Sequence, residues 1–338
     1  ATMGATLILT CDCGIVAHDA VLRARAAGID VVVTDHHTPG PELPDAVAVI
    51  NPNRRDCGYP DKGLAGVGVA WKVCCALAAE VGFPQDRLHG FLDLVAVATI
   101  ADIAPLKGEN RALVRWGLKV LRESPNAGLR ALMRVTGLAD RAEITAAQVG
   151  FVLAPRINAV GRMGEALRGV RLLLTDDDRE AEEIAHTLEA DNVWRRSVEG
   201  DTLREALAAL ELSYDPERDY GIVLASQGWH PGVIGIVASR LVERFHRPVV
   251  MIALDENGEG KGSGRSIHAF NLYEALRDCS GYLVRFGGHR VAAGCSIRAE
   301  NVDAFRDAFN ALARERLTEE DLVPEVRIDL EMELRDAD

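Results

Sequence analysis

The chain has 338 residues, 48% of them hydrophobic and 26% charged, which excludes an intrinsically disordered protein and suits one large or two medium globular domains. Its 38 basic and 51 acidic residues give a formal net charge of −13, so any polyanion must be bound by local basic patches or a metal ion rather than by bulk charge. Seven cysteines at irregular spacing exclude a disulfide framework and indicate a reducing compartment.

Three apolar segments in the first third of the chain share one design, since each runs into an aspartate. They are Leu7–Thr10 before Asp12, Val31–Thr34 before Asp35-His36-His37, and Leu94–Ile100 before Asp102. We interpret them as buried strands of a parallel α/β sheet, in which the carboxyl ends of the strands form the ligand-binding edge. Carboxylates with neutral imidazole are ligands for Mn²⁺ or Mg²⁺ rather than for a thiolate-bound metal. The sequence therefore predicts a divalent-metal site at this edge.

The segments between these aspartates predict further elements of the same domain. Ala17–Ala27 is a helix that ends at Gly28, and Val47–Ile50 is another short strand. Gly63–Ala70 resembles a nucleotide-binding glycine loop, but its spacing is wrong for that motif. We expect these glycines to let a helix pack closely on the sheet and to lead into the helical segment Trp71–Val81.

A helical region is predicted in the middle of the chain. Its three expected helices are Asn110–Leu121, Ala127–Gly137 and Thr145–Leu153. The next segment, Ala154–Met163, is interpreted as a loop whose Arg156, Asn158 and Arg162 bind phosphate, because arginine suits bidentate phosphate contacts. The alternative is a surface loop that is salt-bridged to acidic neighbours.

A long helix and a second α/β unit follow. The helix begins at Thr175-Asp176-Asp177-Asp178 and runs towards Leu212, which is long enough to bridge two domains. The later expected elements are strand Tyr220–Ala225, helix Val233–Phe245, strand Pro248–Leu254, helix Leu272–Arg277, a helix capped by Asn301 and reaching Leu317, and strand Val326–Leu334.

Two glycine-rich segments of this second unit, Gly260–Ser266 and Phe286–Arg290, are interpreted as loops. Their glycines flank Arg265, Ser266 and His289, an arrangement in which backbone N–H groups and a guanidinium can hold a phosphate. With Gly288 included, these residues are the predicted substrate-binding site of the second unit.

The ordered set of motifs resembles the DHH phosphoesterases, and within them most closely the bacterial RecJ single-strand exonucleases. The motifs are Asp12-Cys13-Gly14-Ile15, Asp35-His36-His37, Asp102-Ile103-Ala104-Pro105, Arg156–Arg162, and the Gly-Arg-Ser and Gly-Gly-His signatures around Arg265 and His289. The resemblance implies an α/β fold with a DHH-type parallel-sheet domain, a long linker helix and a smaller mixed α/β DHH-associated domain. The implied ranges are 1–170, 171–214 and 215–318, with 319–338 starting a further segment.

The resemblance also implies roles for the residues of the predicted metal site. Asp12 would bridge two Mn²⁺ or Mg²⁺ ions, and His36 and Asp102 would complete one ion's ligands. Asp35 would orient a water or a ligand, and His37 would contact the scissile phosphate. The family carries an earlier Asp-x-Asp motif, so we expect the DHH domain to be incomplete at its amino end. We therefore expect this chain by itself to hold the second ion poorly and to be a weak or inactive nuclease.

The function implied by the resemblance is a metal-dependent exonuclease that degrades single-stranded DNA from the 5′ end to mononucleotides in DNA repair and recombination. Single-stranded DNA is the implied partner, with a single-strand-binding protein and a helicase as further candidates. No apolar run reaches the ~20 residues of a membrane span, so a soluble cytoplasmic protein is expected. Two alternatives stay open: a phosphodiesterase for short oligonucleotides, nucleoside bisphosphates or cyclic dinucleotides, and a non-catalytic nucleic-acid-binding scaffold.

Overall fold

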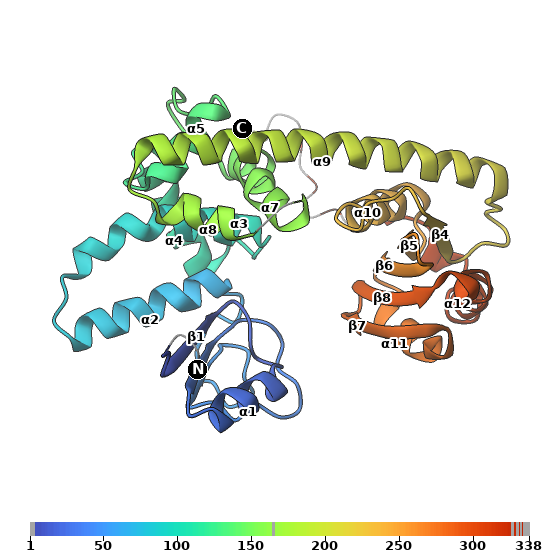
Figure 1. The fold of residues 1–338 in the computed structure, drawn as a ribbon, viewed down its shortest axis with the longest axis horizontal. Helices are drawn as coiled ribbons and strands as arrows, with labels where there is room; N and C mark the ends of the chain where they lie inside the picture. The colour runs from blue at the N-terminus through green and yellow to red at the C-terminus, as the bar shows by residue number, and fades with distance from the viewer. Residues whose placement is uncertain (1–3, 164–165, 326–327, 329–330, 332, 334–338) are drawn as a thin grey trace. The chain divides into compact units, whose positions relative to one another are not determined.

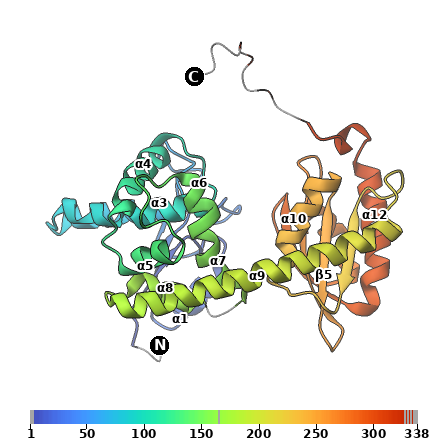
Figure 2. The same ribbon diagram turned by 90° about the horizontal axis from the view of Figure 1, so that it is seen from above.

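The computed structural model describes residues 4–163, 166–325, 328, 331 and 333, except for the side chains of Arg162 and Met163. The chain divides into two compact units, Ala1–Asn192 and Val193–Asp338. The division falls inside one helix, α9 (Asp178–Ser213), which is continuous in both views of the ribbon (Figure 1, Figure 2). The predicted α/β class, with a parallel sheet and a second mixed sheet, is confirmed.

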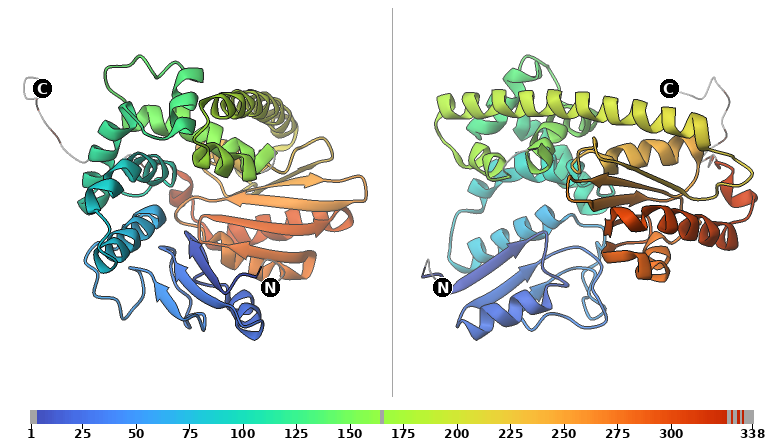
Figure 3. Two further views of the ribbon diagram at one scale, coloured as in Figure 1. Left: turned by 60° about the vertical axis from the view of Figure 1, so that its left-hand side comes forward. Right: turned by 45° about the vertical axis from the view of Figure 1, so that its right-hand side comes forward.

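The first unit contains a three-stranded parallel sheet in the order β1 (Leu7–Cys11), β2 (Asp30–Thr34) and β3 (Ala48–Ile50). Helix α1 (His18–Ala26) packs on β2, and helix α2 (Gly66–Glu80) lies on the opposite side of the sheet (Figure 3). Cys11 pairs with Thr34, and Thr34 pairs with Ile50, so the three carboxyl ends are level. Among the described residues, β1 is an edge strand with exposed apolar side chains.

Helices make up the rest of the first unit. They are a 3₁₀ helix (Gln85–Phe91), α3 (Leu92–Ala101), α4 (Gly108–Arg122), α5 (Ala127–Val135), α6 (Ala146–Gln148), a π-helical turn (Val149–Leu153), α7 (Ala154–Met163) and α8 (Leu167–Leu174). The core between them includes Leu121, Leu129, Leu132, Leu153 and Leu172, all fully buried. The three helices predicted here are confirmed, although the third is short and continues as the π-helical turn.

Two interpretations of the first unit are wrong. Leu94–Ile100 belongs to helix α3 rather than to a strand, and its apolar run has no alternation because α3 is enclosed by neighbours on most of its surface. Ala154–Met163 is helix α7 rather than a loop. Pro155 lies just after the π-helical turn Val149–Leu153, where the regular hydrogen-bond ladder of the helix is already interrupted, so its missing N–H is tolerated.

The second unit contains a five-stranded sheet in the order β4 (Ile222–Ser226), β5 (Val249–Leu254), β6 (Glu259–Arg265), β8 (Ala292–Arg298) and β7 (Leu283–Gly288). β4 and β5 are parallel, and the other neighbours are antiparallel. Helix α10 (Ile234–Phe245) packs on β5 and β6, whereas α11 (Leu272–Asp278) and α12 (Val302–Arg316) contact β8 and β4. Figure 3 shows α10 and α12 on opposite faces of this sheet. Three 3₁₀ turns, at Ser280–Tyr282, Ala299–Asn301 and Glu320–Leu322, complete the described elements.

The two predicted glycine loops of this unit are mostly strand, so that interpretation is wrong. Gly260–Arg265 lies in β6, and Phe286–Gly288 lies in β7. The glycines of β6 alternate because one face of the strand meets the core closely: a Cβ added to Gly264 would lie 2.9 Å from Leu272 Cδ2, and one added to Gly262 would overlap Cys295 Sγ.

Two predictions at the carboxyl end have different outcomes. Asn301 precedes α12, but its side chain donates a hydrogen bond to the carbonyl of Tyr282 (3.3 Å) instead of capping the helix. The predicted strand Val326–Leu334 falls largely outside the described residues.

Helix α9 contributes to both hydrophobic cores. Ala181, Ala185 and Leu188 are fully buried in the core of the first unit, and Ala206 and Leu210 lie in a core of the second. The predicted long helix is therefore confirmed, whereas the exact ranges of the domains stay a prediction. Among the described residues, none of the helices is both long and apolar enough to cross a bilayer.

Close packing of α3 on α4 leads to a stability prediction. A Cβ added to Gly117 of α4 would overlap the carbonyl oxygen of Leu92 and lie 2.6 Å from Ala96 Cβ. We expect Gly117→Ala to lower the free energy of unfolding by about 1–3 kcal/mol, because the two helices must separate. Thermal unfolding measures this effect. As a control, Gly200→Ala in α9, where the nearest heavy atom is 3.9 Å away, should stabilise the protein by about 0.5–1 kcal/mol; equal destabilisation by both changes would contradict the argument.

Candidate metal centre

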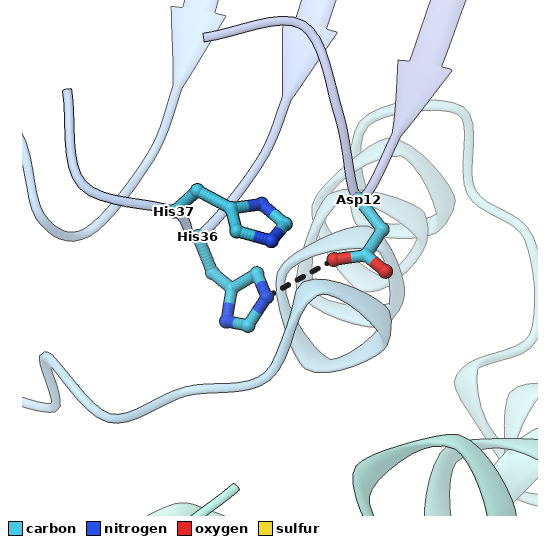
Figure 4. Close-up of side chains that lie close together, drawn as sticks. All are labelled: Asp12, His36 and His37. Carbon is cyan, nitrogen blue, oxygen red and sulfur yellow. Dashed lines mark ion pairs between the residues drawn. The ribbon is translucent and has the colours of Figure 1, made fainter. Parts of the chain in front are cut away.

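The polar residues that follow β1 and β2 meet at the carboxyl edge of the parallel sheet, as Figure 4 shows for Asp12, His36 and His37. Asp12 directly follows β1 and has a left-handed backbone (φ +63°), held by a 3.0 Å hydrogen bond from its N–H to the carbonyl of Thr34. Asp and Asn adopt this conformation more readily than other non-glycine residues. The predicted convergence of these side chains is therefore present in the structure.

His36 lies between two carboxylates. Its Nε2 is 3.0 Å from Asp12 Oδ1 and 3.5 Å from Asp102 Oδ2. The Nε2 atom is buried, yet it has no hydrogen-bond partner among the described residues. A buried ring nitrogen that lies close to two carboxylates but has no hydrogen bond fits a position for a divalent cation bound by oxygen and nitrogen.

Asp35 is buried and holds the loop that carries both histidines. Its Oδ2 accepts a hydrogen bond from the N–H of Ile15 (2.9 Å), and its Oδ1 accepts from the N–H groups of His36 (2.7 Å) and His37 (3.1 Å). Burial raises the pKa of the Asp35 carboxyl, but these hydrogen bonds outweigh burial and the net pKa is lowered. Asp35 is therefore an ionised anchor of the loop.

The other neighbour of Asp35 is the side chain of His37, whose Nδ1 lies 2.7 Å from Asp35 Oδ1. This hydrogen bond is the main reason that the pKa of His37 is raised. It also directs Nε2, the other ring nitrogen, away from Asp35. Ligand atoms of Asp12, His36 and His37 all lie within 4.8 Å of one another, so His37 is placed either to contact a phosphate, as predicted, or to bind a metal.

Asp102 also lies beside His36, although it comes from a different part of the chain than Asp12 and Asp35. It is the residue after α3, and burial, followed by the Asp12 charge, raises the pKa of its carboxyl against the opposing effect of His36. A carboxyl group whose pKa is raised by burial and by a neighbouring negative charge, as that of Asp102 is, is stabilised in the charged form by a bound cation.

A glycine makes room for the carboxylate of Asp12. A Cβ added to Gly66, the first residue of α2, would overlap Asp12 Oδ1 and lie 2.7 Å from its Cγ. The predicted close helix packing by the Gly63–Ala70 segment is therefore observed, and at Gly66 the close approach is to a site residue.

Three asparagines that the sequence analysis did not single out support the site. Asn51 and Asn53 follow β3 and donate hydrogen bonds to the carbonyls of His37 (2.9 Å) and His36 (2.6 Å). Asn110 of α4 is buried and donates to the carbonyls of Gly63 (2.7 Å) and Pro105 (3.1 Å), which joins the segment before α2 to the segment after Asp102. A sequence signal existed for the first two, because Asn51-Pro52-Asn53 ends a strand at the same edge of the sheet.

In the second unit, the predicted phosphate-binding residues lie at one end of the sheet. Arg265 ends β6 opposite Ala292, and the Ser266 N–H donates to the carbonyl of Val291 (3.0 Å) in the turn that also contains His289. Gly288 has φ +141°, and a Cβ there would overlap the backbone of β8.

The Arg265 guanidinium is held near the start of α10. It donates to the carbonyl of Gly264 (2.8 Å) and to Ser263 Oγ (3.3 Å), and a Cβ added to Gly235 would lie 3.1 Å from its Nη2. His289 is exposed. The four residues predicted from two separate motifs are thus neighbours in the fold.

The three candidates on α7 are arranged differently. Arg156 is largely buried, and its Nε and Nη2 groups form a bidentate ion pair with Glu189 of α9. Its Nη1 group donates a hydrogen bond to the carbonyl of Val152 (2.6 Å). This contact matches the alternative that the sequence left open, a salt bridge to an acidic neighbour. Asn158 is exposed on the same helix, and the side chain of Arg162 lies outside the described part of the structure.

Comparison with known proteins gives two family matches: the DHH family, N-terminal domain, over residues 3–99, and the DHHA1 domain, over residues 219–315. The chain is 45% identical over 328 residues to the single-stranded-DNA-specific exonuclease RecJ of Bacillus subtilis, covering 97% of this chain and 41% of that protein. With the Escherichia coli RecJ exonuclease it shares 42% identity over 331 residues, 93% of this chain and 57% of that protein. The chain thus spans about half the length of these relatives.

Solved structures agree with the sequence comparison. The crystal structure of Thermus thermophilus RecJ in complex with Mn²⁺ is similar with a TM-score of 0.81 and 40% identity, covering 92% of this chain and 45% of that one. A crystal structure of exonuclease RecJ bound to manganese gives a TM-score of 0.80 and 41% identity, covering 91% of this chain and 75% of that one.

Proposed function

Because this chain belongs to the RecJ family of DHH proteins, we propose that it is the metal-dependent core of an exonuclease that hydrolyses single-stranded DNA from the 5′ end to mononucleotides. The observation that carries the proposal is the buried His36 Nε2, which lies beside the carboxylates of Asp12 and Asp102 without a hydrogen bond. We assign Asp12, His36 and Asp102 as ligands of Mn²⁺ or Mg²⁺, two ions in the complete site.

Asp12, His36 and Asp102 would hold the divalent ion, which would supply neutralisation of charge on the phosphoryl oxygens and activation of the attacking water. Residues of this chain would position the substrate relative to the ion. Asp35 fixes the loop through three backbone N–H groups and holds Nδ1 of His37. We assign His37 Nε2, the ring nitrogen that is left free of Asp35, to a non-bridging oxygen of the scissile phosphate, where an N–H donor would stabilise the negative charge of the transition state.

We assign Arg265, Ser266, Gly288 and His289 to a second phosphate of the strand, since they lie together and Arg265 is near the start of α10. A phosphate contact by Arg156 would require Glu189 to be displaced, so we assign Arg156 to anchoring α7 on α9 and leave Asn158 and Arg162 as the candidates on that helix. The single-strand-binding protein, the helicase and the cytoplasmic location stay predictions.

The test of the reaction is a 5′-labelled single strand incubated with the protein and Mn²⁺, with product length followed over time. Release of labelled mononucleotide as the first product supports the proposal. Release of label only from very short strands would favour the short-oligonucleotide phosphodiesterase. Binding of single strands with neither hydrolysis nor a Mn²⁺-induced rise in melting temperature would favour the non-catalytic scaffold.

Arg265→Ala should weaken binding of a single-stranded oligonucleotide and make the slope of log affinity against log salt less steep by about 0.7, the value of one phosphate contact on a single strand. A fluorescence-anisotropy titration at several salt concentrations measures both quantities. Arg298→Ala is the matched control, because it removes the same charge at the opposite end of the sheet, where Arg298 of β8 lies opposite Glu259 of β6 in the strand register. A weaker affinity with an unchanged slope would show that Arg265 acts through packing.

A further inference from the structure

Helix α4 presents a row of exposed cations on the side facing away from α3. Arg111, Arg115 and Lys119 are exposed and follow one another at four-residue intervals, which places them on one face of the helix. We call these three side chains the α4 stripe. The buried residues of α4, which include Leu113 and Gly117, lie on the opposite face against α3 and its neighbours. Figure 2 shows α4 beside α3 in the first unit.

An exposed aromatic ring lies beside the stripe. Trp116 is 58% exposed, and Lys119 Nζ lies 4.2 Å from the centroid of its ring. An indole this exposed leaves apolar area in water, and its face can stack on a nucleic-acid base. The cation beside the ring is placed to contact the phosphate next to a stacked base.

Within the described residues, Arg111, Arg115 and Lys119 form no ion pair with a carboxylate, and the next cation of the helix, Arg122, pairs with Glu123. The chain as a whole carries a net charge of −13. Three unpaired cations on one face of an acidic protein are complementary to a polyanion.

The spacing and direction of the stripe suit a single strand. Each four-residue step advances about 6 Å along the helix, within the reach of one nucleotide step of an extended strand. The first turn of α4 is joined to the segment that follows Asp102, because the side chain of Asn110 donates a hydrogen bond to the carbonyl of Pro105. Gly117 faces the carbonyl of Leu92 at the other end of α3, so α4 runs antiparallel to α3 and the stripe leads away from the metal centre.

We propose that the α4 stripe and Trp116 form an auxiliary track for single-stranded nucleic acid, which binds the phosphates and one base of nucleotides outside the metal centre. The inference rests on the proposed function, because the strand on the track is the one whose end would be hydrolysed. Its consequence is that the stripe contributes to the binding of long strands and contributes nothing to the hydrolysis of a dinucleotide.

The test uses the whole chain and two substrates. Affinity is measured with a labelled phosphorothioate dT20, which resists hydrolysis, and activity is measured with the dinucleotide pdTpdT and Mn²⁺. The triple variant Arg111→Gln/Arg115→Gln/Lys119→Gln should bind dT20 about a hundredfold more weakly at about 0.1 M salt, with a salt slope less steep by about 2. Trp116→Ala should weaken binding about tenfold with an unchanged slope, because stacking releases no counterions. Hydrolysis of pdTpdT should be unchanged in both variants.

The matched control removes three other exposed arginines of the same unit, in the variant Arg23→Gln/Arg87→Gln/Arg141→Gln. An equal loss of dT20 affinity in this control would overturn the proposal, since net charge alone would then explain the effect. Loss of pdTpdT hydrolysis in a stripe variant with an unchanged melting temperature would also overturn it. So would stripe-dependent binding of a polyglutamate peptide without stripe-dependent binding of dT20, which would assign the surface to an acidic protein segment. If the unaltered protein hydrolyses nothing but binds dT20 through the stripe, the proposed function fails and the track stands.

Discussion

Asp12→Asn is expected to remove the rise in melting temperature that Mn²⁺ causes in the unaltered protein. At a Mn²⁺ concentration a hundredfold above its Kd, binding adds about 2.7 kcal/mol to the free energy of unfolding, which corresponds to roughly 5–10 °C for a unit of this size. Asparagine keeps the shape of the side chain and tolerates the left-handed backbone at Asp12 (φ +63°). The substitution therefore removes the charge of a ligand without straining the loop.

Hydrolysis of single-stranded DNA by the same variant should fall by at least about a thousandfold, because positioning and charge stabilisation by the bound ion are both lost. Asp140→Asn makes the same chemical change at an exposed position outside the site and should alter neither quantity. A full Mn²⁺ response in Asp12→Asn would remove Asp12 from the ligand set.

Gly66→Ala should impair the metal centre although it leaves every ligand in place. The added Cβ would lie 2.7 Å from Cγ and 2.9 Å from Cβ of Asp12, so the carboxylate must move. A displacement of about 1 Å at a reacting centre can cost roughly a hundredfold in rate. We expect a loss of that order in hydrolysis, together with a smaller Mn²⁺-induced shift in melting temperature.

Gly68→Ala is the matched control for Gly66→Ala, because it lies two residues further along the same helix. The three atoms nearest to its added Cβ would all belong to the side chain of Leu64, with Cδ1 at 2.7 Å. This variant should melt at a lower temperature without metal and still show the full Mn²⁺ shift. If Gly66→Ala also kept the full shift, the contact between Gly66 and Asp12 would have no bearing on metal binding.

Much of the metal centre could be predicted from the sequence because the ends of neighbouring parallel strands meet at one edge. Asp12, Asp35, His36 and His37 follow β1 and β2, so pairing of the two strands is enough to bring them together. The interpretation of the segment before Asp102 as a strand is wrong, yet Asp102 lies beside His36 as expected, and its role as a metal ligand stays a prediction. The residue that follows a helix or a strand has a fixed position in either case. Here Asp102 follows the end of α3 and lies beside His36.

Other features depend on contacts that sequence patterns do not encode. The ion pair between Arg156 and Glu189 joins residues 33 positions apart, and the residue types alone do not distinguish this contact from a phosphate contact. Asn110 donates hydrogen bonds to two backbone carbonyls from different segments. Every residue has a backbone carbonyl, so the sequence does not indicate which of them a side chain will contact.

The sequence of the second unit did contain a signal for strand β6 (Glu259–Arg265). Glu259-Gly-Lys-Gly-Ser-Gly-Arg265 alternates small and polar residues with a period of two, which is the period of a strand. The glycines favoured a loop because a strand interior normally disfavours glycine. In β6 they are required by the close approach of neighbouring side chains such as Cys295 and Leu272.

The participation of α9 in both cores bears on how the helix frays. An isolated helix loses structure from its ends, because only there can a hydrogen bond break without breaking its neighbours. In α9 the first turns are packed through Ala181 and the last turns through Leu210. The amides in the middle of α9 can exchange by two routes. Either one packed end of the helix unfolds first, or the helix breaks internally, which creates two new helix ends with unsatisfied backbone groups. The backbone amides around Gly200 should therefore exchange their hydrogens more slowly than their solvent exposure alone would suggest. Through this one continuous helix, local unfolding in one unit is coupled to local unfolding in the other.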